Sequence, residues 1–372
     1  MKSSFRLVTV RGIPIMINYS WFAIFGLITL TLAHYVFPEF YPDWTTLAYW
    51  IVGLLTSLLF FASLLLHELA HSMLAIRKGI VVRDITLFIF GGAARISREA
   101  DNPGTEFLMA IVGPLSSVAL AGIFALLWLL GRNTSEPLTA VGMYLCWINL
   151  ALAAFNMLPG FPLDGGRVMR SIVWWRSRNY RRSTRIATLT GQAVGCMLVL
   201  GGAVMGAMVY WFSGLWLTFL GVFLFIAAWV SMRQAILRDG IKGLTARDLM
   251  TSDCRTVPAE MSLEDLGNGY LLPGGPRCAL IGGRDGLAGV ITINDLKDVP
   301  QRRWSTTSAA EVMAPVEKMV VVRPEDDGLT VLEKIGEGRA EILLVESGGS
   351  ILGIIDRYHL QGISRARWDS ST

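Results

Sequence analysis

The chain has 372 residues, of which 53% are hydrophobic and only 17% are charged, and its formal net charge is +4. Soluble domains carry charge at about a quarter of their residues, so this composition excludes an entirely soluble protein. The modest net charge, without a basic stripe of interleaved aromatic residues, excludes a typical nucleic-acid-binding face. Residues 1–238 hold nearly all the long apolar runs, whereas residues 244–372 have the composition of soluble protein. We therefore expect a membrane domain over 1–238 and a soluble tail after it.

The N-terminal segment is basic and then apolar, from Ser20 to Phe37. This run is too long for a signal peptide and no small-residue cleavage site follows, so it predicts a retained first span. A span needs about 20 mostly apolar residues. Six segments qualify: 20–37, 46–75, 106–130, 138–158, 186–210 and 215–236. In the third, Gly113 and Pro114 are expected to loosen the helix locally.

Lysine and arginine residues collect in alternate connections between these spans. The N-terminal segment, the second connection and the fourth connection are rich in them, whereas the other connections hold only Arg132. Because positive residues stay on the cytoplasmic side, this asymmetry predicts a cytoplasmic N-terminus and a cytoplasmic tail.

The four cysteines are Cys146, Cys196, Cys254 and Cys278, and they form no CxxC pair. This spacing indicates neither a disulfide framework nor a cysteine-rich zinc site. The two cysteines of the tail suit a reducing cytosol.

The stretch LLHELAHSM (65–73) ends the second span with three ionisable groups. His67 and His71 are four residues apart, so they lie on one helix face and can share a metal ion. Glu68 is displaced by one residue and can reach a metal-bound water, as in other HExxH segments. A solvated polar face is the ordinary explanation for such a motif, but charged groups inside a span are costly and usually functional.

Residues 79–99 contain β-branched and aromatic residues in partial alternation, with a Gly-Gly turn in the middle. This pattern predicts a short hairpin at the cytoplasmic face of the membrane rather than a span.

The segment FNMLPGFPLDGGRVMR (155–170) follows the fourth span, which descends to the cytoplasmic side like the second. A catalytic zinc usually has three protein ligands, and Asp164 is a candidate third ligand at the same membrane depth. The Pro and Gly residues around it break the helix and let the backbone bend toward a cavity. Asp164 could instead cap the helix that begins near Gly165. Asn156 could be a helix-terminal cap or form an interhelical hydrogen bond.

The HELAH motif and the NMLPGFPLDGG segment together resemble the site-2 protease family of intramembrane zinc metalloproteases. Every fixed position of the family pattern N-x-x-P-x-x-P-L-D-G-G is matched between Asn156 and Gly166. The resemblance implies a polytopic α-helical membrane protein with about six transmembrane helices and a short membrane-edge β-sheet. It implies that Asp164 is the third zinc ligand and that Asn156 helps to stabilise the reacting carbonyl. It also implies that Phe90, Gly91 and Gly92 belong to the edge strand that presents the substrate backbone.

The expected chemistry is hydrolysis of a peptide bond in a membrane-spanning segment. Zinc held by His67, His71 and Asp164 lowers the pKa of its water toward neutral, and Glu68 accepts the proton as general base. Asn156 would donate a hydrogen bond to the developing oxyanion. Because the carbonyls of a substrate helix are engaged in helical bonds, the helix must be opened, and strand addition at 85–96 would do this.

The tail contains an internal repeat of about 60 residues, with copies at 244–304 and 305–366. Each copy has a βαββα pattern that resembles a CBS domain, so the tail is expected to be a cytosolic α/β tandem CBS domain. The family's ribose-binding pattern is G-h-h-T-x-x-D, where h is apolar, and copy one has it as GVITIND (289–295). The resemblance implies that Thr292 and Asp295 bind an adenine nucleotide (ATP, ADP or AMP). Copy two has Asp356 and His359 at these two positions, so a second site is in doubt, and the tail could instead only form a homodimer or dock a partner.

Two other classes of protein remain alternatives to a protease regulated through its CBS pair. One is a CBS-gated channel or transporter in which the HExxH segment is an ion or proton site. The other is a catalytically inactive family member that only binds membrane proteins. A transporter gives no reason for a third zinc ligand at matched depth, and the complete set of His67, Glu68, His71 and Asp164 argues against an inactive member. The sequence names neither the substrate nor the need for a prior cut.

Overall fold

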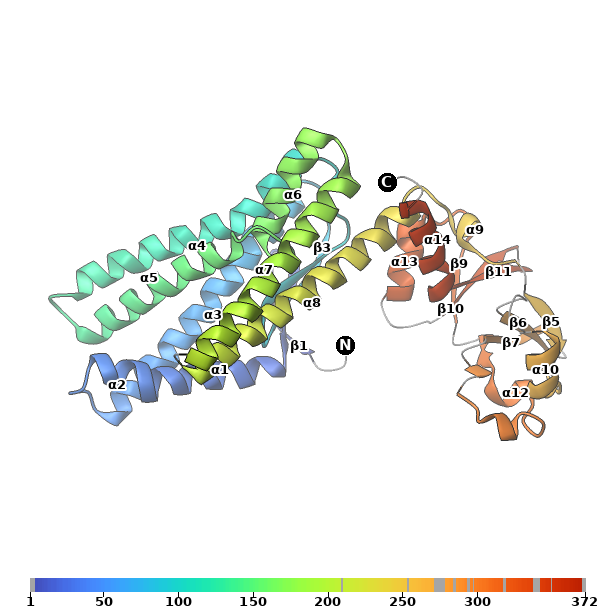
Figure 1. The fold of residues 1–372 in the computed structure, drawn as a ribbon, viewed down its shortest axis with the longest axis horizontal. Helices are drawn as coiled ribbons and strands as arrows, with labels where there is room; N and C mark the ends of the chain where they lie inside the picture. The colour runs from blue at the N-terminus through green and yellow to red at the C-terminus, as the bar shows by residue number, and fades with distance from the viewer. Residues whose placement is uncertain are drawn as a thin grey trace. The chain divides into compact units, whose positions relative to one another are not determined.

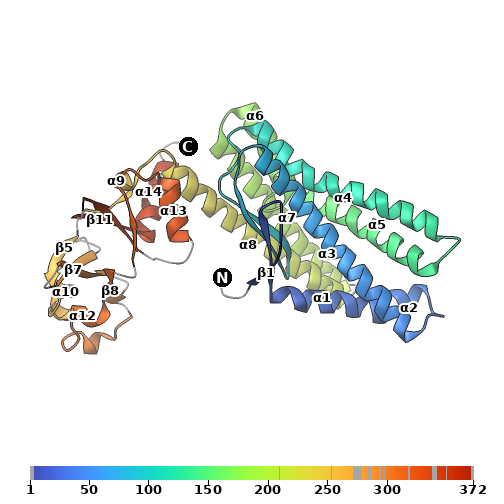
Figure 2. The same cartoon turned by 180° about the vertical axis from the view of Figure 1, so that it is seen from behind.

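The computed structural model describes residues 4–208, 210–252, 254–270, 278–283, 286–292, 295–296, 298–316, 319–336, 342–348 and 350–369. The chain folds as two compact units, Met1–Met232 and Arg233–Thr372. Figures 1 and 2 show them as a group of long helices and a smaller mixed α/β region.

Six helical segments of the described chain are long and apolar enough to cross a membrane, which confirms the six predicted spans. The first, Ser20–Phe40, consists of α1 (Ser20–Thr31), the π-helical turn η1 (Leu32–Val36) and α2 (Phe37–Phe40). The others are α3 (Thr46–Arg77), α4 (Pro103–Gly131), α5 (Glu136–Asn156), α7 (Tyr180–Met208) and α8 (Trp211–Ile241). Figures 1 and 2 show α4 and α5 side by side along their length. With 32 residues, α3 is longer than the 20 or so that a bilayer requires, so the helix continues past its apolar run and carries the HELAH segment near its end.

A four-stranded sheet accompanies the helices, in the order β1-β2-β3-β4. The predicted hairpin is present as β3 (Val82–Phe88) and β4 (Gly91–Ile96), which pair antiparallel. The strands β1 (Ser4–Val10) and β2 (Ile13–Asn18) were not predicted, because their residues read as the flank of the first span. β2 buries alternate isoleucines and pairs parallel with β3, so the N-terminal hairpin completes the sheet.

A short helix, α6 (Asp164–Ser177), lies between α5 and α7. The loop before it folds back closely on the first turn of α6. A Cβ atom on Gly165 would come within 2.4 Å of the Leu158 carbonyl oxygen, and one on Gly166 within 2.3 Å of the Gly160 carbonyl carbon. The Gly-Gly pair is therefore required by this close approach, and it allows Asp164 to begin the helix.

The C-terminal unit contains the predicted repeat as two sheets of similar topology. In each copy the first strand pairs parallel with the second, which pairs antiparallel with the third. The first copy comprises α9 (Ala246–Leu249), β5 (Arg255–Pro258), α10 (Leu263–Gly269), β6 (Cys278–Gly283) and β7 (Gly286–Thr292). After the 3-10 turn η2 (Gln301–Arg303), the second comprises α12 (Ala309–Val312), β8 (Ala314–Pro315), β9 (Val320–Val322), α13 (Gly328–Gly336), β10 (Ile342–Ser347), β11 (Ser350–Asp356) and α14 (Arg357–Asp369).

The leading helices of the two copies are exchanged between their cores. Ala246 and Leu249 of α9 pack with the strands of the second copy, whereas Ala309 of α12 packs with those of the first. β8 likewise pairs with β7. Neither repeat, 244–304 or 305–366, therefore contains a complete hydrophobic core within its own residues.

A disulfide joins Cys254 and Cys278 in the first copy, with the two Cα atoms 5.2 Å apart. The expectation that the tail cysteines are unpaired was wrong. Their separation of 24 residues resembles no spacing motif, and only the fold of β6 beside the segment before β5 brings them together.

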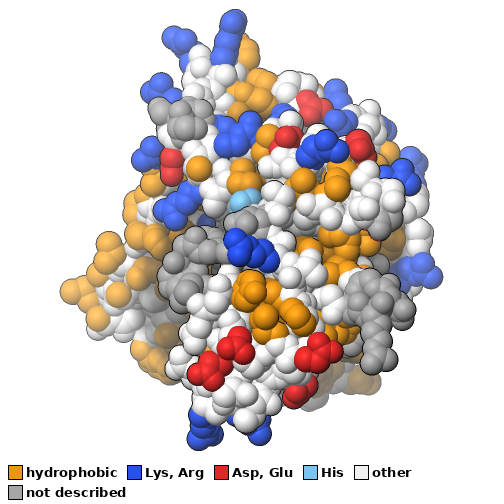
Figure 3. Space-filling view, turned by 90° about the vertical axis from the view of Figure 1, so that its right-hand side faces the viewer, with side chains coloured by type: hydrophobic (Ala, Val, Ile, Leu, Met, Phe, Trp, Pro, Cys, Tyr) orange, Lys and Arg blue, Asp and Glu red, His pale blue; other side chains and the backbone are white. Residues whose placement is uncertain are grey.

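The two units expose different kinds of side chain. Among the described residues of 233–372, the exposed large hydrophobic side chains are Val321 and Leu329, whereas the long helices of the first unit expose many. Hydrophobic side chains and charged side chains of both signs share the face shown in Figure 3. The first unit thus has the surface of a multi-pass membrane protein and the second that of a soluble domain.

Candidate metal centre and active site

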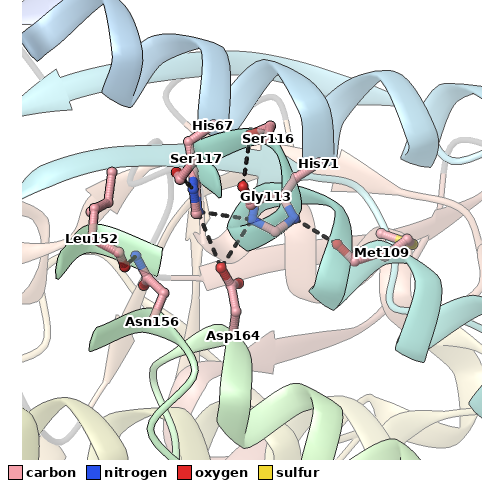
Figure 4. A network of polar contacts seen from close by, with 9 residues as sticks. All are labelled: His67, His71, Met109, Gly113, Ser116, Ser117, Leu152, Asn156 and Asp164. Atoms are coloured by element: carbon pink, nitrogen blue, oxygen red, sulfur yellow. Dashed lines mark hydrogen bonds and ion pairs between the residues drawn. The ribbon is translucent and has the colours of Figure 1, made fainter. Parts of the chain in front are cut away.

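Three ligand-type atoms from two helices meet at one point. His67 Nε2 and His71 Nε2 of α3 lie 3.2 Å apart, and Asp164 Oδ2 at the start of α6 lies 3.1 Å from each of them. Figure 4 shows the three side chains pointing toward one another. Among the described residues, this is the group of three or more His, Cys, Asp or Glu side chains placed to hold a metal ion.

The spacing of these atoms fits zinc. Tetrahedral zinc with bonds of about 2.0–2.1 Å separates its ligand atoms by about 3.3 Å, close to the edges of this triangle. Two imidazoles and one carboxylate are also a common ligand set for a catalytic zinc, which keeps a fourth position open. His67 is 2% exposed and His71 9%, so solvent does not compete for their ring nitrogens on most sides.

The outer ring nitrogens of both histidines contact α4. His71 Nδ1 lies 2.5 Å from the Met109 carbonyl oxygen, and His67 Nδ1 lies 2.9 Å from Ser117 Oγ. Because a carbonyl oxygen only accepts, His71 Nδ1 carries the proton and its Nε2 is left free to bind a metal. Neither Met109 nor Ser117 was predicted in this role, since nothing in their local sequence marks it.

Gly113 provides the space for the two rings. A Cβ atom at this position would come within 2.1 Å of His71 Nε2 and 2.7 Å of His67 Nε2. Gly113 and Pro114, which the sequence predicts to loosen the helix locally, lie inside α4, which continues without a break from Pro103 to Gly131. The glycine is explained by close packing against the candidate metal site.

Asp164 is the first residue of α6, where the unpaired N–H groups of the helix start favour a negative charge. Burial acts to raise the pKa of its carboxyl group, but hydrogen bonds with His67 and His71 lower the pKa more, and the net shift is downward. The carboxylate is therefore ionised and available as a ligand. The cap role that the sequence left open is compatible with this position but does not explain the contact with both imidazoles.

Glu68 lies beside the edge strand. A Cβ atom on Gly92 of β4 would come within 2.6 Å of Glu68 Cγ, so the strand backbone passes directly against this side chain. β4 is the last strand of its sheet and pairs with β3, so its other side is an edge of the sheet. Gly91 and Gly92 begin β4, whereas Phe90 lies in the turn before it and stacks on Phe223 of α8 at 4.6 Å.

Asn156 is the last residue of α5 and lies on the Asp164 side of the site in Figure 4. Its Nδ2 donates to the Leu152 carbonyl oxygen at 3.0 Å, within its own helix. This contact engages one of the two Nδ2 hydrogens, so the amide has a second N–H with which to donate to a reacting carbonyl.

The candidate nucleotide-binding residues of the tail contact each other. Asp295 Oδ2 accepts from the Thr292 backbone N–H at 2.7 Å and from Thr292 Oγ1 at 2.8 Å. In copy two, the His359 backbone N–H donates to Asp356 Oδ1 at 2.8 Å. In each copy a carboxylate thus accepts a backbone N–H three residues away, from a preceding residue in copy one and from a following residue in copy two. Ile293 and Asn294 of the predicted motif lie outside the described residues.

Comparison of the sequence with known proteins identifies a family. The model of the family described as "Peptidase family M50" matches residues 55–133 and 131–200. A protein of Synechocystis sp. named as a zinc metalloprotease is 34% identical over 96% of this chain and 94% of its own length. The protein Rip3 of Mycobacterium tuberculosis, also named as a zinc metalloprotease, is 32% identical over 95% of this chain and 91% of its own length.

Solved structures match both parts of the chain. A site-2 protease from Methanocaldococcus jannaschii covers 62% of this chain and 95% of that chain, at 26% identity and a TM-score of 0.43. The CBS domain of a bacterial CNNM/CorC family Mg²⁺ transporter covers 36% of this chain and 83% of that chain, at 16% identity and a TM-score of 0.29. The zinc metalloproteases are 34% and 32% identical over nearly the whole chain, and the family match includes the candidate site. The chain therefore belongs to peptidase family M50, the site-2 protease family of zinc metalloproteases.

Proposed function

We propose that the protein is an intramembrane zinc endopeptidase that cuts membrane-spanning substrates near the cytoplasmic face, with residues 1–238 as the protease domain. His67, His71 and Asp164 hold one zinc ion per chain. The observation that carries this proposal is the convergence of their ligand atoms, 3.1–3.2 Å apart, in a chain with six candidate spans. A bound zinc ion supplies Lewis acidity, which makes water a better nucleophile.

Glu68 is the general base that takes the proton from the attacking water and returns it to the leaving amine. Its position one residue after His67 on α3 supports this role. Asn156 donates to the developing oxyanion with the second hydrogen of its Nδ2, and a well-aimed donor of this kind contributes about 3 kcal/mol to transition-state stabilisation.

The substrate is bound as an added strand along β4. The strand has an edge position in its sheet, and its Gly92 backbone lies against Glu68. Addition of an extended segment there satisfies the peptide groups that a substrate helix exposes when it opens. Phe90, Gly91 and Gly92 form the start of this presenting segment.

The orientation follows from the distribution of positive residues. With the N-terminus and the tail in the cytoplasm, the HELAH end of α3 and the Asp164 end of α6 lie at the cytoplasmic side of the bilayer. Water then reaches the site from the cytoplasm without crossing the hydrocarbon core.

A purified full-length chain in detergent tests the proposal by two measurements, bound zinc and cleavage of a single-span reporter. For Glu68→Gln we expect zinc to be retained and cleavage to be lost, because the ligands are intact and the base is removed. Glu39→Gln is the matched control, an exposed carboxylate of α2 in the first span, and it is expected to cleave like the wild type. A wild-type chain without zinc, or equal cleavage by wild type and Glu68→Gln, contradicts the assignment and favours a transporter or an inactive binder.

For the tail, we propose two CBS repeats, 244–304 and 305–366, that bind an adenine nucleotide in copy one and change access to the membrane site. The hydroxyl of Thr292 and the carboxylate of Asp295 lie together and offer the donor and acceptor that ribose hydroxyls need. Homodimerisation through the CBS pair is part of the same proposal, and size determination of the detergent-solubilised chain tests it.

A further inference from the structure

A buried charged cluster lies outside the ligand set. Arg170 of α6 donates from Nε to Glu106 Oε1 of α4, and its Nη1 donates to Tyr180 Oη of α7 at 2.8 Å. Its Nη2 lies 3.0 Å from Glu99 Oε2, to which Tyr180 Oη also donates. The guanidinium stacks over the ring of Phe161 at 4.9 Å and over that of Tyr180 at 5.0 Å. One arginine thus joins four separate segments of the membrane unit.

Stability alone is a poor explanation for this cluster. Arg170 is 4% exposed and Glu106 1%, and the desolvation of buried charges generally cancels most of their attraction. Glu106 Oε2 also has no hydrogen-bond partner among the described residues. Apolar residues of similar volume would stabilise such a site at least as well. Burial lowers the pKa of Arg170, but Glu99 and Glu106 raise it more, so the side chain remains a cation.

The cluster lies between α6, which carries Asp164, and α4, which contacts the outer ring nitrogens of both histidines. Glu106 is one turn before Met109, whose carbonyl oxygen orients His71. Arg170 is six residues after Asp164, on the same helix. The Arg170–Glu106 pair therefore fixes the helix that carries the carboxylate ligand against the helix that orients the imidazoles.

The same arginine also reaches the segment that follows the edge strand. Glu99 is three residues after Ile96, the last residue of β4. A displacement of Arg170 would therefore act on two distances, between Asp164 and the histidines and between β4 and Glu68.

We propose that Arg170 is a positioning residue, which through Glu106, Glu99 and Tyr180 sets the separation of Asp164 from His67 and His71 and so the affinity of the site for zinc. This inference rests on the proposed zinc site. Residues that orient metal ligands typically contribute 10- to 100-fold in metal affinity.

The test uses the full-length chain in detergent and three readouts: the zinc dissociation constant by competition with a chelator, the visible absorption of the cobalt-substituted protein, and the melting temperature without metal. Arg170→Lys keeps the charge but loses the planar fork that contacts both carboxylates. We expect its zinc affinity to fall about 10- to 100-fold and its cobalt spectrum to change. Tyr180→Phe removes one hydroxyl and leaves both carboxylates on Arg170, so it is expected to weaken zinc binding less, by about threefold to tenfold.

Arg98→Lys is the matched control. Arg98 lies in the same connection as Glu99 but pairs with Asp101 in an exposed position, at 3.0 Å. Its zinc affinity and cobalt spectrum are expected to equal those of the wild type.

Three results overturn the inference, and they differ in whether the proposed function fails as well. If both Arg170→Lys and Tyr180→Phe bind zinc like the wild type and only melt earlier without metal, the cluster is structural and the proposed function stands. If Arg170→Lys does not fold, unchanged zinc binding and an unchanged cobalt spectrum for Tyr180→Phe also mean that the cluster is structural. If the wild type binds no zinc, the proposed function fails and the inference fails with it.

Discussion

Two short motifs, one in each unit, behave differently in the structure. In the membrane unit, His67 and His71 meet a carboxylate that lies 93 residues after the second of them, and the contacts join α3 to α6. In the tail, Thr292 and Asp295 are three residues apart and contact each other. A local cap accounts for the contact between the two tail residues, whereas no local requirement explains why Asp164 touches two histidines of another helix. Convergence of distant residues is therefore stronger support for a site than a matched pattern.

The largest loss of zinc binding and cleavage is expected at Gly113, whose missing side chain leaves room for the rings of His67 and His71. In Gly113→Ala the new Cβ atom would lie 2.1 Å from His71 Nε2, a distance that forces the imidazole out of its position. We expect zinc to be lost and cleavage with it, although alanine favours the helix. Zinc content and reporter cleavage measure this.

Gly122→Ala provides the comparison on the same helix, since nothing lies within 4 Å of the Cβ atom that it would add. It should retain zinc and cleave normally. Normal zinc binding by Gly113→Ala would mean that α4 does not confine the histidines.

A smaller effect is expected at Gly92. A substitution there is expected to impair substrate presentation without impairing zinc binding. In Gly92→Ala the added Cβ atom lies 2.6 Å from Glu68 Cγ, the middle of a flexible side chain that can shift. We expect zinc to be retained and cleavage to fall by about 10- to 100-fold, because the base and the edge strand move apart.

The control for this variant is Gly104→Ala, in the first turn of α4, where the nearest atom is at an ordinary contact distance of 3.6 Å. Cleavage by Gly92→Ala at the wild-type rate would remove the main support for substrate binding along β4.

The sequence predicted the spans well because apolar runs of sufficient length have few alternatives to a transmembrane helix. It predicted the β3–β4 hairpin from alternation, but the turn is formed by Ile89 and Phe90, and the Gly-Gly pair predicted as the turn begins β4. It missed β1 and β2, whose residues adjoin the first span, because β2 joins the sheet by pairing with a distant segment, Ile15 with Ile85 of β3, and β1 pairs with β2. It missed the Cys254–Cys278 disulfide for the same reason, since the pair is formed by tertiary structure rather than by spacing.

In the candidate site, the sequence predicted the metal ligands and the general base but not the groups that contact them. His67, Glu68, His71 and Asp164 are recognisable by residue type, spacing and membrane depth. The Met109 carbonyl and Ser117 are not, because a backbone oxygen and a common hydroxyl carry no sequence signal. Arg170 and Glu106 looked like ordinary charges beside a membrane, and only their burial and mutual contact distinguish them.

The smallest effect is expected in the tail, at Asp295. The carboxylate accepts two hydrogen bonds from Thr292, and loss of a helix cap costs about 0.5–2 kcal/mol. Asp295→Asn should therefore lower the unfolding free energy of the C-terminal unit by this amount and leave zinc content and basal cleavage unchanged. If the motif also binds ribose, titration of the full-length chain with ATP, ADP and AMP gives heat for the wild type and much less for the variant. Asp356→Asn is the comparison in copy two, because Asp356 also accepts a backbone N–H three residues away, from His359, but has no predicted nucleotide contact. Suppose that both variants lose the same unfolding free energy and that the wild type gives no heat with any nucleotide. The tail motif would then be a helix cap only, and of the two motifs only the membrane site would indicate chemistry.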